Sequence, residues 1–164
     1  MVLIMDKIDI LAELDESIYM QRERANAEDK HILYDEPEML PPVIGDRNRL
    51  RQVFINIIDN ALKYSEPGGV VNVHIAQVED TIEIVIADNG CGIPAEHLPK
   101  VKQKFYKANQ TVRGSGIGLA VADEIIRLHK GTLNIDSVEN VGTTVTITLP
   151  IVRPPLPEET EQEP

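Results

Sequence analysis

Apolar residues recur along this chain with two periods, and each period predicts one kind of element. A spacing of three and four residues, typical of helices with one buried side, occurs in 6–30, 46–69 and 113–131. Strict alternation of apolar and polar residues, typical of strands with one buried face, occurs in shorter stretches. These predicted strands are 71–75, 82–86, 132–136 and 143–150, and HILYD at 31–35 is a further short candidate.

The first two predicted helices differ in how they begin and end. The first continues from its apolar part into a charged run, QRERANAEDK, which we interpret as the solvated end of the same helix. Its apolar positions are Ile8, Leu11, Leu14 and Ile18. The second begins after Asp46, a good N-cap residue, and the sequence SEPGG at 65–69 stops it.

The third predicted helix follows three glycines, and we expect Gly131 to be its C-cap. His129 lies in its last turn, where a partly charged imidazole is favoured by the helix dipole. The predicted apolar face consists of Ile117, Val121, Ile125 and Leu128.

Composition narrows the class of protein. A chain of 164 residues suits one domain with a real core, and 42% apolar with 26% charged residues indicates a soluble globular body. No apolar run approaches the roughly 20 residues that cross a bilayer, and MVLIM at the start lacks the basic flank of a signal peptide. The single cysteine, Cys91, fits a reducing compartment. The net charge of −11 argues against a general nucleic-acid binder. The net charge does not argue against a nucleotide ligand. Charges are screened beyond a Debye length of about 8 Å, so lysines close to the ligand matter more than the total.

The second helix carries polar residues that core packing does not explain. Asn56, Asn60 and Lys63 lie on one face, roughly 120° from the apolar stripe. A solvated helix surface is the simpler interpretation. Asparagine, however, is a poor helix former, so two in mid-helix favour a face that binds an anion or a hydrated metal.

The predicted hairpin ends in ADNGCGIP, where an acidic residue leaves a strand into a double-glycine turn. The sequence is compatible with an ordinary tight turn. Alternatively, Asp88 is a hydrogen-bond acceptor at the strand's end, and Gly90 and Gly92 let the backbone approach a flat ligand. Cys91 lacks a neighbouring base or second cysteine, which disfavours a catalytic thiol.

A basic segment and a glycine motif follow. Residues 95–113 give a short helical start and are then compatible with a plain surface loop or with a mobile lid whose cations reach phosphates. Glycines at a helix N-terminus expose N–H groups that favour a phosphate. The motif is not a dinucleotide fingerprint, and no Walker lysine follows it. The basic residues are Lys100, Lys102, Lys104, Lys107 and Arg113, and the glycines are Gly114, Gly116 and Gly118.

In this order, the NxxxN helix, DNGCGIP, KFYK and GSGIGL resemble the N, G1, F and G2 boxes of a known family. They are similar to the catalytic, ATP-binding domain of bacterial sensor histidine kinases, in the superfamily shared with gyrase and the MutL repair proteins. The resemblance covers about residues 30–150. It implies an α+β, two-layer sandwich known as the Bergerat ATP-binding fold, with a mixed, mostly antiparallel sheet covered on one face by three helices.

The resemblance also implies roles for individual residues. Asn60 would bind Mg²⁺, Asp88 would bind the adenine amino group of ATP, and the glycines would bind its phosphates. Thr143 would support the adenine site, Phe105 belongs to the F box, and Asn56 is a candidate catalytic residue. The predicted cofactor-binding residues are Asn56, Asn60, Lys63, Tyr64, Asp88, Gly90, Gly92, Ile93, Lys107, Arg113, Gly114, Gly116, Gly118, Leu119 and Thr143.

Two features depart from the family's pattern. Lys102 stands where the F box usually has its first aromatic residue, a change that concerns the lid and not the nucleotide pocket. The phosphoaccepting histidine, which the family carries in a helical hairpin and follows with an acidic residue, is also absent. The histidines without that setting are His31, His74, His97 and His129. The chain therefore looks like a catalytic half.

The kind of acceptor follows from Asn56. Hydrolytic relatives such as gyrase carry a glutamate base at this place, four residues before Asn60. An imidazole attacks with its own lone pair and needs no such base, whereas water or a serine hydroxyl does. This favours phosphoryl transfer to histidine over a gyrase-like ATPase or an anti-sigma serine kinase. A non-enzymatic nucleotide-binding scaffold stays open, although it would be expected to have lost Asn60 or Asp88.

We expect three regions. Residues 1–30 are a helix arriving from a missing dimerisation and phosphoacceptor domain, 31–150 are the kinase domain, and 151–164 are a disordered acidic tail rich in proline. The expected partners are ATP with Mg²⁺, the histidine-bearing hairpin and, indirectly, the receiver domain of a response regulator. We expect a cytoplasmic chain that contacts neither nucleic acid nor membrane, whether or not the parent protein is anchored.

Overall fold

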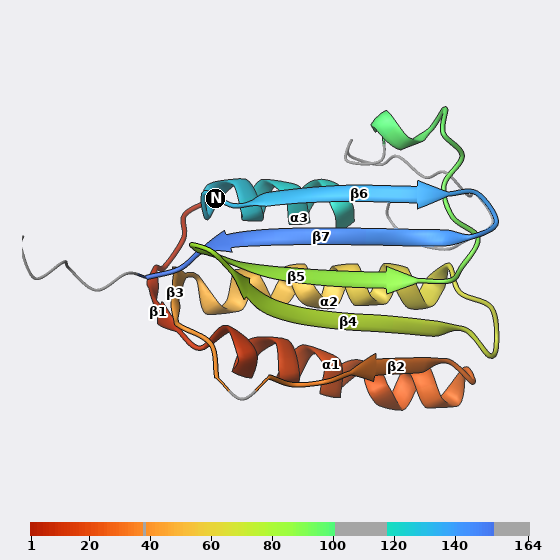
Figure 1. Cartoon of the computed structure of the whole chain (residues 1–164), viewed down its shortest axis with the longest axis horizontal. Coiled ribbons are helices and arrows are strands. Elements are labelled where there is room, and N and C mark those ends of the chain that lie inside the picture. The colour runs from red at the N-terminus through yellow and green to blue at the C-terminus, as the bar shows by residue number, and fades with distance from the viewer. Residues whose placement is uncertain (38, 101–117, 153–164) are drawn as a thin grey trace, which may run out of the picture.

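A five-stranded sheet and three helices form two layers in the computed structural model, which describes residues 1–37, 39–100 and 118–152 (Figure 1). The strand order is β2-β4-β5-β7-β6. Only the pair β2 and β4 is parallel; the other three pairs are antiparallel. The strands are β2 (His31–Tyr34), β4 (Val70–Val78), β5 (Thr81–Asp88), β6 (Thr132–Val138) and β7 (Gly142–Pro150). The predicted mixed, mostly antiparallel sheet is confirmed.

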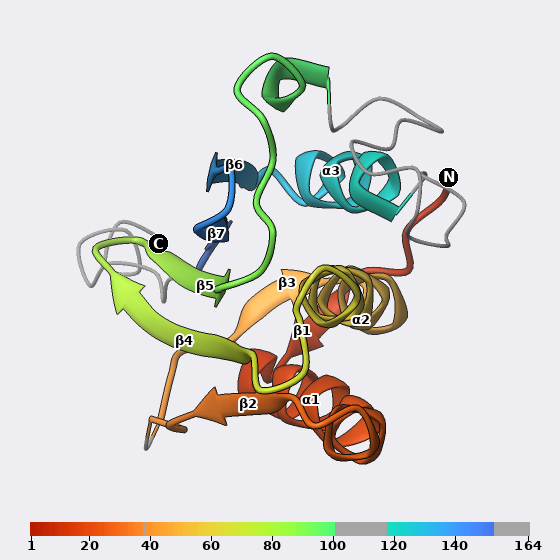
Figure 2. The same cartoon turned by 90° about the vertical axis from the view of Figure 1, so that its right-hand side faces the viewer.

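All three helices cover the same face of this sheet, as Figure 2 shows from the end. They are α1 (Ile10–Ala27), α2 (Arg47–Lys63) and α3 (Gly118–Leu128). The middle helix, α2, packs against α1 on one side and α3 on the other. The predicted two-layer sandwich is therefore correct. No helix in the described part of the chain is long and apolar enough to cross a membrane.

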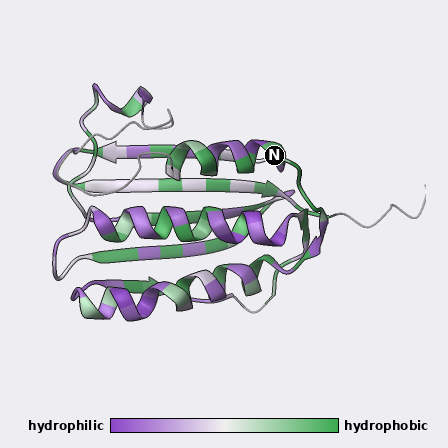
Figure 3. Cartoon of the chain, turned by 180° about the vertical axis from the view of Figure 1, so that it is seen from behind, coloured by the Kyte–Doolittle hydropathy of each residue, from purple (hydrophilic) through white to green (hydrophobic). Residues whose placement is uncertain are grey.

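The core lies between the sheet and the helices, where the alternating strands turn their apolar side chains inward. Phe54 of α2 is completely buried in this core. The alternating apolar residues of the predicted strands 71–75, 82–86 and 143–150 are all buried as well: Val71, Val73, Ile75, Ile82, Ile84, Ile86, Val145, Ile147 and Leu149. Seen from behind, the helices show apolar stripes beside polar ones (Figure 3). His74 points away from this core and is exposed. Leu14 and Ile18 of α1 are buried in the same core, so α1 is an integral part of the helical layer.

Two short strands at the N-terminal side were not predicted. Strands β1 (Asp6–Ile8) and β3 (Val43–Gly45) form a separate antiparallel pair. The prediction that Ile8 belongs to the first helix is wrong, because Asp9 caps α1 by accepting from the N–H groups of Leu11 and Ala12. Ile8 is nevertheless buried, so it packs in the core as part of a strand and not of a helix.

Asp46 is the N-cap of α2, as predicted. Its carboxylate accepts from the N–H of Arg49 over 3.1 Å and from the N–H of Ile4 over 2.8 Å. The Ile4 bond lowers the pKa of Asp46 against the opposing effect of burial. One side chain thus fastens both the start of α2 and the N-terminal segment that leads into β1.

Helix α3 presents only part of the predicted face to the core. Its buried residues are Ala122, Ile125 and Ile126, so Ile125 is buried as predicted, and Val121 packs half-buried against the core. Leu128, predicted to be inward, is 44% exposed, and Ile117 lies outside the described residues. The error has a geometric cause, since the buried stripe continues from Ile125 by one full turn to the residue after Leu128, which is a histidine.

That histidine, His129, is 3% exposed. Its Nε2 accepts from the backbone N–H of Asp46 over 2.9 Å, and its Nδ1 donates to the Ile125 carbonyl over 2.7 Å. A ring nitrogen that accepts carries no proton, so the imidazole is neutral. The prediction of a partly charged histidine at the helix end is wrong; His129 instead ties the end of α3 to the start of α2.

The C-terminus of α3 uses two residues where one was predicted. Lys130 adopts the left-handed conformation, with φ of 62°, and the N–H of Gly131 reaches back to the Ile126 carbonyl over 2.9 Å. Gly131 is required for a different reason, because a Cβ there would overlap the carbonyl oxygen of Thr148. Gly131 therefore allows α3 to turn tightly onto β7.

The first testable prediction concerns His129. Replacement by alanine leaves the buried Asp46 N–H without an acceptor and opens a cavity, so we expect a loss of about 2 to 4 kcal/mol in the free energy of unfolding. Urea denaturation followed by circular dichroism measures it. His74→Ala is the control and should change stability by no more than about 0.5 kcal/mol. Equal effects of the two substitutions would contradict the structural role of His129.

Candidate functional site

The predicted site residues that the structure describes come from four elements. The C-terminal ends of β5 and α2 and the start of β7 lie at one end of the fold, on the right of Figure 1, and the N-terminus of α3 points towards the same end. Lid residues and two of the glycines lie outside the described residues: Phe105, Lys107, Arg113, Gly114 and Gly116.

Asp88 is the last residue of β5 and pairs with Val71 of β4 and Thr143 of β7. Its Oδ1 accepts from the backbone N–H of Gly90 over 2.9 Å and from that of Thr143 over 3.3 Å. Burial raises the pKa of Asp88, although both hydrogen bonds act in the opposite direction. Within the described ranges, no hydrogen bond reaches Oδ2. One carboxylate oxygen is thus fixed by two backbone N–H groups, which also sets the direction of the other.

The loop after Asp88 can approach its neighbours because three positions lack a Cβ. At Gly90 a Cβ would overlap the Tyr64 carbonyl at the end of α2, and at Gly142 it would overlap the Asp88 carbonyl. Gly92 has φ of 70°, which glycine adopts without strain. The glycines of this turn therefore allow close packing of the backbone, which is compatible with the tight turn expected from the sequence. Gly142 was not among the predicted site residues, although it is the glycine of the family's Gly-Thr pair, whose threonine is the predicted residue Thr143.

Thr143 is linked to the loop through Ser137 of β6. The Ser137 hydroxyl lies 2.8 Å from that of Thr143, donates to the Gly142 carbonyl over 2.9 Å and accepts from the N–H of Ile93 over 2.7 Å. The predicted residues Ile93 and Thr143 are thus joined by a residue that the sequence did not indicate. A serine in an alternating strand carries no signal of such a role.

Tyr64 connects α2 to the same loop. Its backbone carbonyl accepts from the N–H of Cys91 over 3.1 Å, and burial raises the pKa of its half-buried phenol. Tyr64 is a predicted site residue, and the contact that places it beside this loop is made by its main chain. Lys63 pairs with Asp59, the residue one turn earlier in α2, over 3.0 Å.

Asn56 and Asn60 are half-buried on α2. Successive residues of a helix are about 100° apart around its axis, so Asn60 is turned roughly 100° from Asp59, towards α3. Asn56 and Lys63 have directions between those of Asp59 and Asn60. Both side chains offer neutral amide oxygens, which suit a hard cation such as Mg²⁺. In the described part of the chain, no three His, Cys, Asp or Glu side chains are grouped so as to hold a metal.

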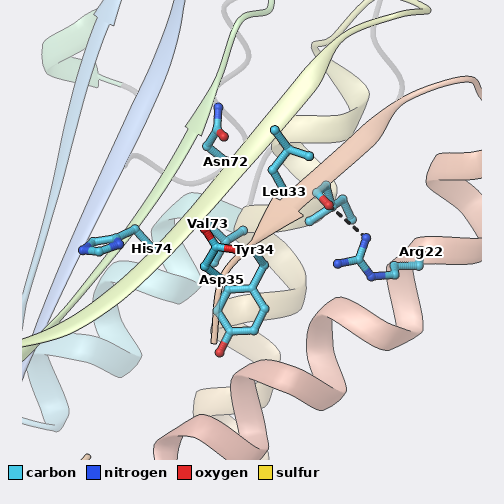
Figure 4. A pocket seen from close by; sticks show the side chains of 8 residues that line it. Arg22, Leu33, Tyr34, Asp35, Asn72, Val73 and His74 are labelled. Atoms are coloured by element: carbon cyan, nitrogen blue, oxygen red, sulfur yellow. Dashed lines mark hydrogen bonds between the residues drawn. The ribbon is translucent and has the colours of Figure 1, made fainter. Parts of the chain in front are cut away.

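A hollow of about 600 Å³ lies on another part of the molecule (Figure 4). It is lined by Arg22 of α1 and by residues of β2 and β4, among them Tyr34, Asn72 and His74. The Arg22 guanidinium donates to the Ile32 carbonyl there over 2.9 Å. This hollow contains none of the predicted site residues, so the two features are separate.

Comparisons with known proteins identify the family of this chain. The family model described as "Histidine kinase-, DNA gyrase B-, and HSP90-like ATPase" matches residues 45–153. The heme sensor protein HssS of Staphylococcus saprophyticus is 38% identical over 129 residues, which are 79% of this chain and 28% of that protein. The sensor histidine kinase WalK of Bacillus subtilis is 40% identical over 111 residues, 64% of this chain and 18% of WalK. The matched part of the chain thus spans less than a third of the length of each of these relatives.

Solved structures give the same result. The mycobacterial sensor histidine kinase MprB matches with a TM-score of 0.77 and 31% identity, over 92% of this chain and 100% of that chain. The catalytic domain of histidine kinase ThkA matches with a TM-score of 0.81 over 91% of this chain and 97% of that chain. The ThkA sequence is only 21% identical, so that match concerns the fold alone.

The second testable prediction follows from the raised pKa of Asp88. The ionised form is less favourable in the folded protein than in the unfolded one. Protonated Asp88 therefore stabilises the fold below the unfolded pKa of about 3.9, and this contribution is lost as the pH rises through the higher folded pKa. At pH 7, Asp88→Asn removes the buried charge and keeps an oxygen for Gly90 and Thr143. We expect the melting temperature to rise by about 1 to 4 °C.

Thermal unfolding at several pH values measures this effect. The difference between Asp88→Asn and the parent should shrink as the pH falls towards about 4. Asp136→Asn changes the net charge equally at an exposed position and should leave the melting temperature unchanged. A lower melting temperature of Asp88→Asn at pH 7 would show that the carboxylate stabilises the fold.

Proposed function

We propose that this chain, which belongs to the family of histidine kinase-, DNA gyrase B- and HSP90-like ATPases, is the ATP-binding and catalytic domain of a sensor histidine kinase. The observation that supports the proposal is that Asp88, the end of α2 and the start of β7 meet at one end of the sheet, towards which the N-terminus of α3 points. The relatives are several times longer than this chain, so the remaining parts of the reaction belong to other segments or other chains.

Asp88 is suited to recognise adenine. A carboxylate that accepts two backbone N–H groups on one oxygen keeps a fixed direction for the other oxygen. The adenine amino group is a donor, and a hydrogen bond between it and a charged acceptor contributes about 1.5 to 3 kcal/mol. Partial burial strengthens this interaction because water competes less. We therefore assign the base to the pocket beside Asp88, with Thr143 and Gly90 holding the carboxylate in place.

The phosphates fit the other side of the site, near the start of α3. This helix begins at Gly118 and has 11 residues, so its first turn provides N–H groups and a positive dipole end. Leu119, in that first turn, is half-buried. Lys63 adds a cation from α2, and we assign Lys107, Arg113, Gly114 and Gly116 to the same end from the sequence motif.

Asn60 would hold Mg²⁺ through its amide oxygen, with Asn56 beside it. Mg²⁺ usually takes one or two protein ligands and fills its octahedral shell with water and substrate phosphates, which fits this donor set. When bound, the metal neutralises charge that develops on the phosphates during transfer. The protein's own contribution is to orient the amide, because α2 is packed between α1 and α3.

The acceptor is a histidine outside this chain. A ring nitrogen attacks the γ-phosphorus with its lone pair, the bond to the β,γ-bridging oxygen breaks, and ADP leaves. Asn56 cannot act as a general base, but the attack of an imidazole lone pair does not need one. Within the chain, His129 has both ring nitrogens occupied by backbone groups, and His74 faces away from the site on the open side of the sheet.

We therefore place the acceptor histidine on a separate helical hairpin. A response regulator's receiver domain would take the phosphoryl group from that hairpin, so its relation to this chain is indirect. The substrate ATP and the reduced single cysteine are consistent with a cytoplasmic domain.

The third testable prediction concerns the metal. Asn60→Ala should weaken ATP binding about ten- to a hundredfold in excess Mg²⁺, the loss of one ligand contact to a charged group, and by less than about twofold in EDTA. Titration calorimetry in the two buffers measures it. Asn72→Ala, an exposed asparagine on β4, is the control. Equal losses with and without Mg²⁺ would mean that Asn60 supports the fold and not the metal.

The fourth testable prediction concerns the transfer itself. Effective molarities for well-positioned groups reach about 10⁵ to 10⁸ M, and only an acceptor held in line with the γ-phosphate receives that advantage. We expect the isolated chain to bind Mg-ATP, hydrolyse it slowly and not label itself. Addition of a helical hairpin with a histidine followed by an acidic residue, from upstream of a relative's kinase domain, should produce label on the hairpin.

Incubation with γ-labelled ATP followed by acid treatment reads out this experiment. A phosphohistidine loses its label in acid, whereas a phosphoserine keeps it. A hairpin with alanine in place of the histidine should stay unlabelled. Acid-stable label on this chain alone would overturn the histidine assignment in favour of a serine kinase.

A further inference from the structure

Five charged side chains join the end of α1 to the last turns of α2, and we call them the charge chain. In order of contact they are Lys30, Glu28, Arg24, Asp59 and Lys63. Both helices end on the same side of the fold as the candidate site (Figure 1). Lys63 is a predicted cofactor-binding residue, which the proposed function assigns to the phosphates. The charge chain therefore connects the site with a helix that contributes no residue to it.

Lys30 anchors one end of the charge chain. Its ammonium donates to the Leu62 carbonyl over 2.6 Å and to Glu28 over 3.0 Å, and the residue is buried. Leu62 directly precedes Lys63, so the charge chain starts and finishes in the same turn of α2. The last turn of α2 is thereby held by α1 and by the segment that follows it.

Each carboxylate of the charge chain is divided between two cations. Glu28 uses Oε1 for Lys30 and Oε2 for Arg24, both over 3.0 Å. These two hydrogen bonds lower the pKa of Glu28. Asp59 uses Oδ1 for the Arg24 guanidinium and Oδ2 for the Lys63 ammonium. Burial alone would lower the pKa of Arg24, but its bonds to Asp59 and Glu28 raise it.

Asp59 is the point where the two helices compete. Its side chain is 25% exposed, and those of Arg24 and Lys63 are 33% and 30% exposed. A carboxylate that is mostly removed from water is costly to leave without a cation. If Lys63 turns towards a phosphate, Asp59 keeps its charge paired only because Arg24 remains on the other oxygen. Without Arg24, the same movement of Lys63 would leave the Asp59 carboxylate without a cation.

We propose that Arg24 is a positioning residue that sets the affinity for the phosphates of the nucleotide by sharing Asp59 with Lys63. This inference rests on the proposed function, because it takes Lys63 as a phosphate ligand. Arg24 makes the ammonium of Lys63 available to a phosphate by pairing with Asp59. A displacement of α1 along α2 would remove Arg24 from Asp59. Helix α1 thereby controls a site that it does not touch.

The fifth testable prediction is that Arg24→Gln weakens ATP binding by the full chain about two- to fivefold, the range of a partly exposed ion pair. Arg22→Gln is the matched control, since it removes the same charge from the same helix, and Arg22 contacts the Ile32 carbonyl and not Asp59. It should leave the affinity for ATP unchanged. Arg24→Lys, which keeps the charge beside Asp59, should restore an affinity within about twofold of the parent.

Two further measurements separate positioning from a general effect on the fold. Adenosine has the base but no phosphate, so Arg24→Gln should bind it as well as the parent does. In a Lys63→Met background, Arg24→Gln should have no further effect on ATP binding, because the residue through which it acts is gone. Calorimetry gives the affinities, and circular dichroism verifies that each variant is folded.

The outcomes are distinct. If the parent chain binds no ATP, the proposed function fails and this inference with it. If the parent binds ATP and Lys63→Met weakens binding, but Arg24→Gln resembles Arg22→Gln, the proposed function stands and the positioning role is overturned. Equal losses for adenosine and ATP, or an Arg24→Gln effect that persists without Lys63, would also overturn it.

Discussion

The close approach of three backbone segments at the end of β5 is the constraint on which the candidate site depends. The end of α2 lies against Gly90, and the start of β7 lies against Asp88 at Gly142, where any Cβ would overlap a carbonyl oxygen. This packing places two N–H groups on one oxygen of Asp88. It also removes the carboxylate from water and so raises its pKa. A charged group is retained there at a cost to stability, as is common at binding sites.

Helix α2 can carry asparagines in its middle because other elements fix it along its length. At its start, Asp46 is held by His129 and Ile4. Near its first turns, Arg51 pairs with the buried Glu13 of α1 over 2.7 Å. At its end, Lys30 holds the Leu62 carbonyl. A residue of low helix propensity costs only a few tenths of a kcal/mol to about 0.7 kcal/mol, and tertiary packing of this kind overrides that cost.

The parts of this structure that were predictable from the sequence are those governed by local periodicity. Alternation identified the inward residues of β4, β5 and β7, and the N-cap at Asp46 followed from its place before an apolar stripe. The parts that were missed depend on contacts distant in sequence. The pairing of β1 with β3 joins residues about 37 apart in three-residue strands, too short for a period to show. The burial of His129 and the bridging role of Ser137 require partners 83 and 44 residues away.

The physical unit that forms the site is larger than the segment that identifies its family. The family model begins at residue 45, yet Leu14 and Ile18 of α1 complete the core beside α2, and β2 extends the sheet from β4. Residues before 45 also supply every cation and carboxylate of the charge chain except Asp59 and Lys63. Motifs mark the atoms that touch a ligand, whereas the energies that orient those atoms come from neighbours whose identity can vary as long as charge and volume are kept. In this protein the neighbour is α1, so the motif-bearing helix and the helix before it act as one structural element.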